Sequence, residues 1–322
     1  MGASLLSVVL LMGAAWFARA RYLAAGPLLA SQVVVIPRGT PAQVGDALAA
    51  ARVIDNATEF RVAAALTRWA GPLHTGELAF PALASLSDTL DVLRFGHPVQ
   101  HRVTIPEGLT AAQIAVLLDR TAALGGDPVV PAEGAMLPET YDFDHGATRA
   151  SIMQRAEDAM DHALTGIWAG RSDEVKLDSP RQLVTLASIV ERETARPEER
   201  AHIASVFLNR LRRGMRLQSD PTVIYAVTGG AGVSGHPITR AELDWSNPYN
   251  TYTIPALPPG PIDSPGIAAM QAVAHPMTTD DLYFVADGQG GHAFAATLEE
   301  HRHKVAAWRA LAAQPAATPN GK

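Results

Sequence analysis

The first strong pattern in the chain is an almost unbroken apolar run from Ala3 to Ala18, followed directly by Arg19 and Arg21. The run has no polar face, which is not typical of a helix in a soluble core. It is shorter than the roughly 20 residues that span a bilayer, and Ala18-Arg19-Ala20 is similar to a signal-peptidase site. Both arginines follow the run, where the positive-inside rule favours the cytoplasm. We predict a membrane anchor or signal over residues 1–22, with its orientation left open.

A short repeat organises the next part of the chain. Val35-Ile36-Pro37-Arg38-Gly39-Thr40 returns as Thr104-Ile105-Pro106-Glu107-Gly108-Leu109. Each copy is typical of a strand that ends in a turn, because Pro fixes φ and Gly tolerates a positive φ. Amphipathic spacing after each copy predicts helices over Pro41–Ala51 and Thr110–Thr121. We therefore predict a small α/β module over residues 31–125, either a spacer or a carbohydrate-binding module.

From Ser179 onward, capping signals mark successive helices. Ser179 and Pro180 are typical of a helix start, and this helix is predicted to reach Thr194. A second helix is predicted from near Pro197 to Gly214, with acids in its first turn and arginines in its last. The order of elements predicts a mixed α+β domain over residues 126–312 and a disordered tail over residues 313–322, so the fold class is α+β. The remaining predicted elements are a short helix capped by Asp220, a long loop over Ser246–Pro265, a helix starting at Ser264-Pro265, a hairpin of Leu282–Val285 with His292–Ala295, and a helix capped by Thr297.

Composition excludes several classes of function. A chain of 322 residues has room for two domains. The net charge of −6 and the lack of a long basic run argue against nucleic-acid binding. With no cysteine, the chain has no disulfide, cysteine nucleophile or thiolate metal site. The histidines have no metal-ligand spacing, and we predict neither a metal nor a cofactor.

Two acids, Glu191 and Glu193, lie near the end of the helix that starts at Pro180. Residues two positions apart are about 200° apart around a helix, so the two carboxyls cannot share one site. Each lies at an edge of the apolar face that contains Leu183 and Val190. Partial burial can raise the pKa of a carboxyl there, as a general acid near neutral pH requires. The periodicity does not favour either acid, and ordinary surface ion pairs would also explain both.

The motifs around these acids extend over most of the chain, and the longest runs from Leu186 to Thr222. Upstream, Glu133–Tyr141 adds a weaker match that departs from the pattern at Ala135 and Met136. Further matching motifs are Asn247-Pro248-Tyr249-Asn250-Thr251-Tyr252, Leu257–Ile262, Ala274-His275-Pro276 and Leu282–Gly288. Together they resemble the endolytic murein transglycosylase, or YceG-like, family, and the N-terminal half is similar to that family's LysM-like domain.

The resemblance implies an enzyme that cuts the β-1,4 bond between N-acetylmuramic acid and N-acetylglucosamine in nascent peptidoglycan, leaves 1,6-anhydro-muramyl ends and terminates strand elongation. It implies that Glu191 is catalytic. This acid would protonate the leaving oxygen and then take the proton of the sugar's own C6 hydroxyl, so that no second carboxylate is needed. It also implies a single-pass protein of the cytoplasmic (inner) membrane with an extracytoplasmic catalytic domain. Its partners would be glycan strands, the membrane and peptidoglycan synthases.

Polar and aromatic residues in these motifs are candidate glycan ligands. The polar side chains would bind N-acetyl and hydroxyl groups, and the tyrosines would stack on sugar faces. Some have equally plain structural interpretations, such as helix capping by Asp220 or a turn role for Glu139. The candidates are Gln218, Ser219, Asp220, Tyr249, Asn250, Tyr252 and Glu139.

Two other functions stay open on the sequence alone. One is an ordinary glycan hydrolase, in which another acid such as Asp220 activates water and the product has a reducing end. The other is a non-enzymatic cell-wall-binding or division scaffold whose functional part is the LysM-like module. An intact Glu191 in a complete motif argues against the scaffold.

Overall fold

The computed structural model describes residues 2–312, and it begins with a long apolar helix, α1 (Gly2–Leu23). Within α1, Leu5–Leu23 is long and apolar enough to cross a membrane. At 1.5 Å per residue this segment is about 28 Å long, close to the hydrocarbon thickness of a bilayer. Its large side chains are exposed, for example Leu11 at 70% and Trp16 at 73%, so α1 is not a core helix. The predicted tail over residues 313–322 lies outside the described residues.

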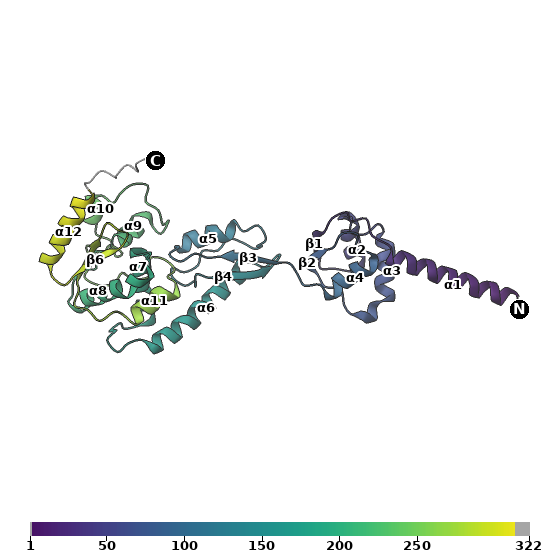
Figure 1. The fold of residues 1–322 in the computed structure, drawn as a ribbon, viewed down its shortest axis with the longest axis horizontal. Coiled ribbons are helices and arrows are strands. Elements are labelled where there is room, and N and C mark those ends of the chain that lie inside the picture. Colours follow the sequence, from purple (N-terminus) through teal and green to yellow (C-terminus); the bar gives the residue numbers. More distant parts are fainter. Residues whose placement is uncertain (1, 313–322) are drawn as a thin grey trace, which may run out of the picture. The chain divides into compact units, whose positions relative to one another are not determined.

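The chain forms two compact units, and the first comprises residues 1–102, 123–125 and 142–147. Its centre is an antiparallel pair of strands in which Val34 lies opposite Leu78. Phe60 and Phe80 are fully buried between this pair and the helices. Burying one such side chain stabilises the fold by about 1.5–3 kcal/mol. The elements after α1 are β1 (Gln32–Ile36), α2 (Pro41–Ala50), α3 (Ala57–Leu66), the 3-10 turn η1 (Arg68–Ala70), β2 (Gly76–Phe80) and α4 (Leu86–Phe95) (Figure 1).

The two copies of the repeat fall in different units. Both form a strand, turn and helix as predicted, and Thr40 and Thr110 cap their helices. The second copy, however, belongs to the second unit, which comprises residues 103–122, 126–141 and 148–322. Two backbone hydrogen bonds attach it there, from the Ser264 N–H to the carbonyl of Leu109 and from the Gly108 N–H to the carbonyl of Ser264. The first compact unit thus differs from the predicted module over residues 31–125, and its interpretation as LysM-like stays a prediction.

The second unit is built around α7 (Pro180–Glu193), which packs against α8 (Arg200–Arg212) and α11 (Ile267–Ala274). Every residue from Leu183 to Val190 is buried. We expected one apolar face, but helices cover α7 on several sides. Its other elements are α5 (Ala111–Asp119), α6 (Arg149–Gly170), η2 (Pro197–Glu199), α9 (Asp220–Thr228), α10 (Arg240–Leu243), β5 (Tyr283–Ala286), β6 (His292–Ala295) and α12 (Leu298–Ala312). The strands β3 (Gln100–Thr104) and β4 (Thr140–Asp144) have residues in both units.

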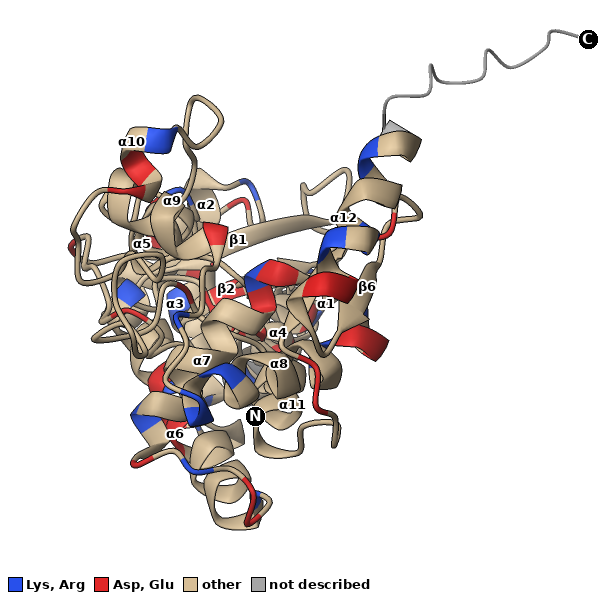
Figure 2. Cartoon of the chain, turned by 90° about the vertical axis from the view of Figure 1, so that its left-hand side faces the viewer, with Lys and Arg blue, Asp and Glu red and all other residues tan. Residues whose placement is uncertain are grey.

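Most predicted helix starts and the β5–β6 hairpin are confirmed, but two helix starts were wrong. The N-cap of α9 is Ser219 rather than Asp220, because the Asp220 carboxylate instead accepts a hydrogen bond from Tyr252. Helix α11 begins at Ile267 rather than at Ser264-Pro265, because Ser264 pairs with Leu109. Figure 2 shows the acidic first turn of α12 and basic residues further along it, the arrangement that a helix dipole favours.

A buried arginine, Arg210, holds the hairpin to α8. Its Nε donates to the carbonyl of Leu282 and its Nη1 to that of Leu217, both at 2.6 Å. Arg210 is only 7% exposed, and burial lowers its pKa. Its neighbour Asn209 donates to two more carbonyls of the same loop. These two side chains therefore have a structural role rather than lying on the helix surface.

We expect Arg210→Lys to destabilise the fold by about 1–3 kcal/mol. A lysine does not reproduce the two N–H donors of the guanidinium group and leaves a buried carbonyl unpaired. Urea denaturation of the purified protein measures this change in the free energy of unfolding. Arg213→Lys, at the exposed C-cap of α8, is the matched control. Equal stability of the two variants would contradict the structural role of Arg210.

Candidate functional site

The C-terminal end of α7 carries Glu191 and Glu193, and the two carboxyls have different surroundings. Glu191 Oε1 accepts a hydrogen bond from Arg200 Nη2 at 3.1 Å, and Oε2 accepts one from the backbone N–H of Gly266 at 3.0 Å. Glu193 Oε1 instead accepts from the hydroxyl of Ser219 at 2.5 Å. As the spacing predicted, the two acids do not share a site.

The Glu191 side chain is buried, and its hydrogen-bond partners only partly offset the cost of burying its charge. Its side chain is only 6% exposed. Burial raises its pKa, while the Gly266 N–H and the Arg200 guanidinium lower it and the nearby Glu107 raises it further. The net shift is upward, so Glu191 keeps its proton at higher pH than an ordinary glutamate does. This is the property that a general acid near neutral pH needs.

A glycine at the start of α11 allows the close approach of a second acid. A Cβ on Gly266 would lie 1.8 Å from Glu107 Oε1, so any side chain there would displace Glu107. Glu107 Oε2 lies 3.6 Å from Arg200 Nη2. Arg200 is therefore shared between Glu191, which is buried, and Glu107, whose side chain is 44% exposed.

Two further carboxyls lie in the same part of the unit. Asp263 is 1% exposed, and neither of its oxygens has a hydrogen-bond partner among the described residues. Burial holds the pKa of Asp263 well above its usual range, with Arg192 acting against it and Glu191 and Glu133 adding to it. Glu133 accepts from the N–H of Ala111 at 2.7 Å, and burial raises its pKa as well. Glu191 is therefore one of several acids that influence one another.

Glu193 is the second acid with a strongly raised pKa. Burial raises it to about 7, against the hydrogen bond from Ser219. Ser219 in turn donates its N–H to Thr251 Oγ1 at 2.9 Å, and Thr222 Oγ1 lies 2.8 Å from the same atom. These buried hydroxyls form a network that joins α7 to the start of α9 and to the loop around Thr251.

This network holds a strained residue, Gln218. Its φ is +51°, a conformation that costs a non-glycine residue of order 1–3 kcal/mol. The Gln218 N–H donates to the carbonyl of Thr251 at 3.1 Å, and its side chain is exposed. An exposed polar side chain in a strained turn is consistent with its predicted role as a glycan ligand.

The other predicted ligands differ in how available they are. Asp220 is exposed and accepts from the Tyr252 hydroxyl at 2.5 Å, and the ring of Tyr249 lies 4.8 Å from that of Tyr225. Asn250 is 0% exposed, and its amide donates to three backbone carbonyls. Its side chain therefore orders the loop and is not free for a sugar. The Ser219 hydroxyl is likewise bound to Glu193, and Glu139 is exposed at the start of β4.

Sequence reasoning missed Arg200, Glu107 and Asp263 as neighbours of Glu191. The sequence contains one signal for Glu107: the two copies of the repeat differ there, with Arg38 in the first copy and Glu107 in the second. The contacts themselves join residues far apart in the sequence, such as Glu191 and Gly266, 75 positions apart, and Glu107 and Arg200, and no local pattern encodes them. Within residues 2–312, no three acidic or histidine side chains are grouped to hold a metal ion.

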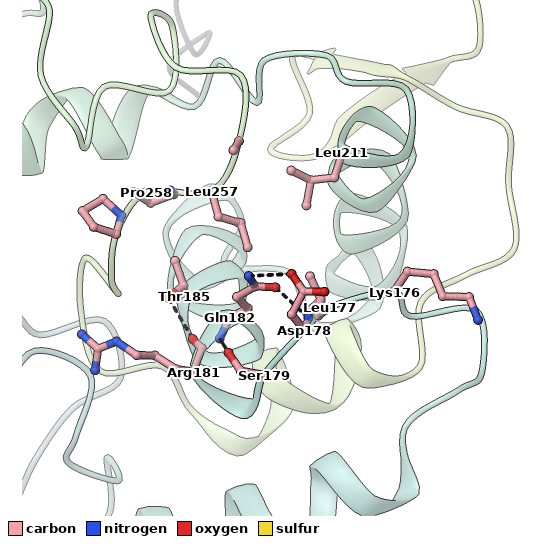
Figure 3. A pocket seen from close by; sticks show the side chains of 12 residues that line it. Lys176, Leu177, Asp178, Ser179, Arg181, Gln182, Thr185, Leu211, Leu257 and Pro258 are labelled. Carbon is pink, nitrogen blue, oxygen red and sulfur yellow. Dashed lines mark hydrogen bonds between the residues drawn. The ribbon is translucent and has the colours of Figure 1, made fainter.

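A separate hollow of about 480 Å³ lies at the opposite end of α7. Figure 3 shows Asp178, Ser179 and Gln182 on one side of it and Leu257 and Pro258 on another. Gln182 is nine residues from Glu191, which is about 14 Å along the helix. The hollow therefore does not include either acid.

The raised pKa of Glu193 makes the stability of the fold depend on pH. The folded chain keeps this proton up to about pH 7, whereas the unfolded carboxyl loses it near 4.5. The stability from this group is thus fully present below 4.5 and is lost as pH rises through about 7. Between pH 5 and pH 8 the free energy of unfolding of wild type loses this contribution, and that of Glu193→Gln does not. We therefore expect the decrease to be about 2 to 3 kcal/mol larger in wild type than in Glu193→Gln. Urea denaturation at both pH values tests this.

Glu198→Gln is the control for that experiment, because Glu198 is exposed in η2. Its variant is expected to keep the wild-type dependence on pH. If Glu193→Gln also keeps that dependence, then Glu193 is not the group that holds the proton.

The fold and the site define an α+β protein in which a central buried helix ends in two acids with raised pKa values. A family model described as the YceG-like family matches residues 34–307. The chain therefore belongs to the YceG-like family.

Two relatives and one crystal structure support this membership. The chain is 37% identical over 171 residues, 53% of its length, to the endolytic murein transglycosylase of Bacillus subtilis (strain 168). It is 37% identical over 180 residues to the protein of the same name from Streptococcus pneumoniae (strain D39). These matches cover 46% and 32% of the two relatives. A crystal structure of a YceG-like protein from Listeria monocytogenes is 30% identical with a TM-score of 0.53, covering 85% of this chain and 98% of that one.

Proposed function

We propose that this protein is an endolytic lytic transglycosylase that cleaves the bond between N-acetylmuramic acid and N-acetylglucosamine in nascent peptidoglycan and so terminates strand elongation. The observation that carries the proposal is Glu191, a buried acid whose pKa is raised and which has a fixed hydrogen-bond geometry. The names of the relatives support the reaction class, and the family match covers the site.

In the proposed reaction, protonated Glu191 gives its proton to the glycosidic oxygen as the bond to the anomeric carbon breaks. The C6 hydroxyl of the muramyl residue then attacks that carbon, and its proton passes to the Glu191 carboxylate. The products are a new 4-hydroxyl end and a 1,6-anhydro-muramyl end, and no water is consumed. Arg200 and the Gly266 N–H stabilise the carboxylate between the two proton transfers, and Glu191 regains its proton within each cycle.

An ordinary hydrolase would need a second carboxylate to direct water. Asp220, the acid that we considered for this role, accepts from Tyr252, and its neighbour Ser219 contacts Glu193 rather than Glu191. This arrangement argues against Asp220 as that second carboxylate. A purely scaffolding role gives no reason for keeping a buried acid with a raised pKa, because such a group lowers stability at neutral pH.

We further propose that Gln218, Asp220, Tyr249 and Tyr252 contact the glycan and that Ser219 and Asn250 shape the loops that carry them. Glu139 stays a candidate for support of the site. The first unit would bind glycan as a LysM-like module. Helix α1 would anchor the protein in the cytoplasmic membrane with the catalytic unit on the extracytoplasmic side, close to the peptidoglycan synthases that make the strands.

The first test is mass spectrometry of the products formed from uncrosslinked glycan strands. We expect wild type to produce anhydro-muramyl ends and Glu191→Gln to lose at least about 100-fold in rate, the contribution typical of a general acid. Glu198→Gln, an exposed acid of the same charge, is the matched control and is expected to retain activity. Reducing ends from wild type would identify a hydrolase, and no cleavage by wild type would favour the scaffold.

The dependence of the rate on pH tests the role of Arg200. Because the general acid starts protonated, the rate is expected to fall as pH rises through the pKa of Glu191. Arg200→Met removes a cation that lowers this pKa, so the fall is expected at higher pH than in wild type, as measured by kcat/KM across the pH range. Arg200→Lys keeps the charge and is expected to stay closer to wild type. A shift to lower pH in Arg200→Met would contradict this assignment.

A further inference from the structure

Helix α3 of the first unit has an apolar face that the described chain leaves uncovered. Val62 is 54% exposed and Leu66 is 74% exposed, and Trp69, in the turn after α3, is 85% exposed. Buried residues of the same helix, Phe60 and Ala64, already supply its contact with the core. The exposed face is therefore a second apolar surface rather than part of the core.

This face forms one wall of a groove whose other wall is α1. The groove has a volume of about 540 Å³, and Figure 1 shows α3 beside the end of α1. The two walls are joined by an ion pair, Arg21 Nη2 to Glu59 Oε2 at 3.1 Å. The apolar lining residues are Phe17, Ala18, Tyr22, Val62, Ala63, Leu66 and Leu86.

The position of the groove along α1 indicates what it meets. On α1 the groove is lined by residues between Phe17 and Tyr22, which lie in the last part of the span Leu5–Leu23. When a helix of about 28 Å crosses a bilayer, its last turns lie at the boundary between acyl chains and headgroups. The groove and the exposed face of α3 therefore lie at that depth when α1 is inserted.

The residues around the groove have the chemistry of a membrane interface. Tryptophan and tyrosine are enriched at this boundary, and Trp69 and Tyr22 lie there. Arginines near the surface attract lipid phosphates, and Arg19, Arg61 and Arg68 are exposed around the same elements. Apolar walls with a basic rim match one phospholipid, with its acyl chain inside and its phosphate outside.

We propose that the groove between α1 and α3 binds a phospholipid of the membrane that contains α1, and that Val62, Leu66 and Trp69 rest in that membrane's interface. The proposal uses the membrane anchoring of α1 proposed above and is independent of the transglycosylase reaction. Burial of Val62 and Leu66 in lipid then holds the first unit against the bilayer, so that it does not pivot freely on α1.

The lack of cysteine in the chain permits a direct test with single labelled cysteines. Full-length Gly13→Cys, Leu66→Cys and Val35→Cys variants would carry an environment-sensitive fluorophore. They would be placed in nanodiscs whose phospholipids carry quenchers both near the headgroup and near the end of the acyl chain. Gly13 has open space around it in α1, and Val35 is a 47% exposed apolar residue on β1, at the end of the unit away from α1 (Figure 1). We expect quenching at Leu66 of at least half that at Gly13, and none at Val35.

Quenching at Gly13 without quenching at Leu66 would overturn the proposal and leave the anchor intact, and quenching at neither site would overturn both. A blue-shifted but unquenched label at Leu66 with two chains in each disc would identify a second copy in the groove, which also overturns it. In the Leu66→Cys background, Val62→Glu is expected to reduce the quenching at least twofold, and Val35→Glu, the matched control, is expected to leave it unchanged.

Discussion

The rest of the second unit depends on how the Glu191 carboxyl is held inside it. Taking an ionisable group out of water costs several kcal/mol unless partners compensate it. Here the partners come from two other helices, Arg200 at the start of α8 and the Gly266 N–H at the start of α11. The requirement to satisfy one carboxyl therefore fixes the ends of three helices that also pack together as the core. A change in their packing would alter the proton affinity of Glu191.

The two-residue spacing of the acids also determines what Glu193 contacts. Because Glu193 lies on the other side of α7, it reaches Ser219 and, through it, the hydroxyl network around Thr251. That network also supports the left-handed turn at Gln218. One helix end thus orders two separate surfaces, an acid cluster on one side and a loop with exposed polar side chains on the other.

Local signals in the sequence predicted local structure well. Ser179 and Pro180 predicted the start of α7, and the glycine-rich turn predicted the hairpin, because capping and turn formation involve residues a few positions apart. The cap predicted for α9 was wrong, since the Asp220 carboxylate accepts a hydrogen bond from Tyr252, 32 residues away. The spacing of Glu191 and Glu193 predicted separate sites but not which partners each would have. Those partners depend on tertiary contacts.

The unpaired carboxyl of Asp263 is costly to the fold, and its position suggests why it is retained. The charge of Glu191 raises the pKa of Asp263, since a nearby negative charge disfavours ionisation. Protons on such interacting acids belong to the group as a whole, and the loss of one proton makes the next harder to remove. Burial is the largest cause of the raised pKa of Asp263, so the neutral form of this acid is favoured next to Glu191. In the proposed reaction, protonated Asp263 therefore adds no negative charge beside Glu191 when Glu191 forms its carboxylate, in contrast to Glu107, which raises the pKa of Glu191.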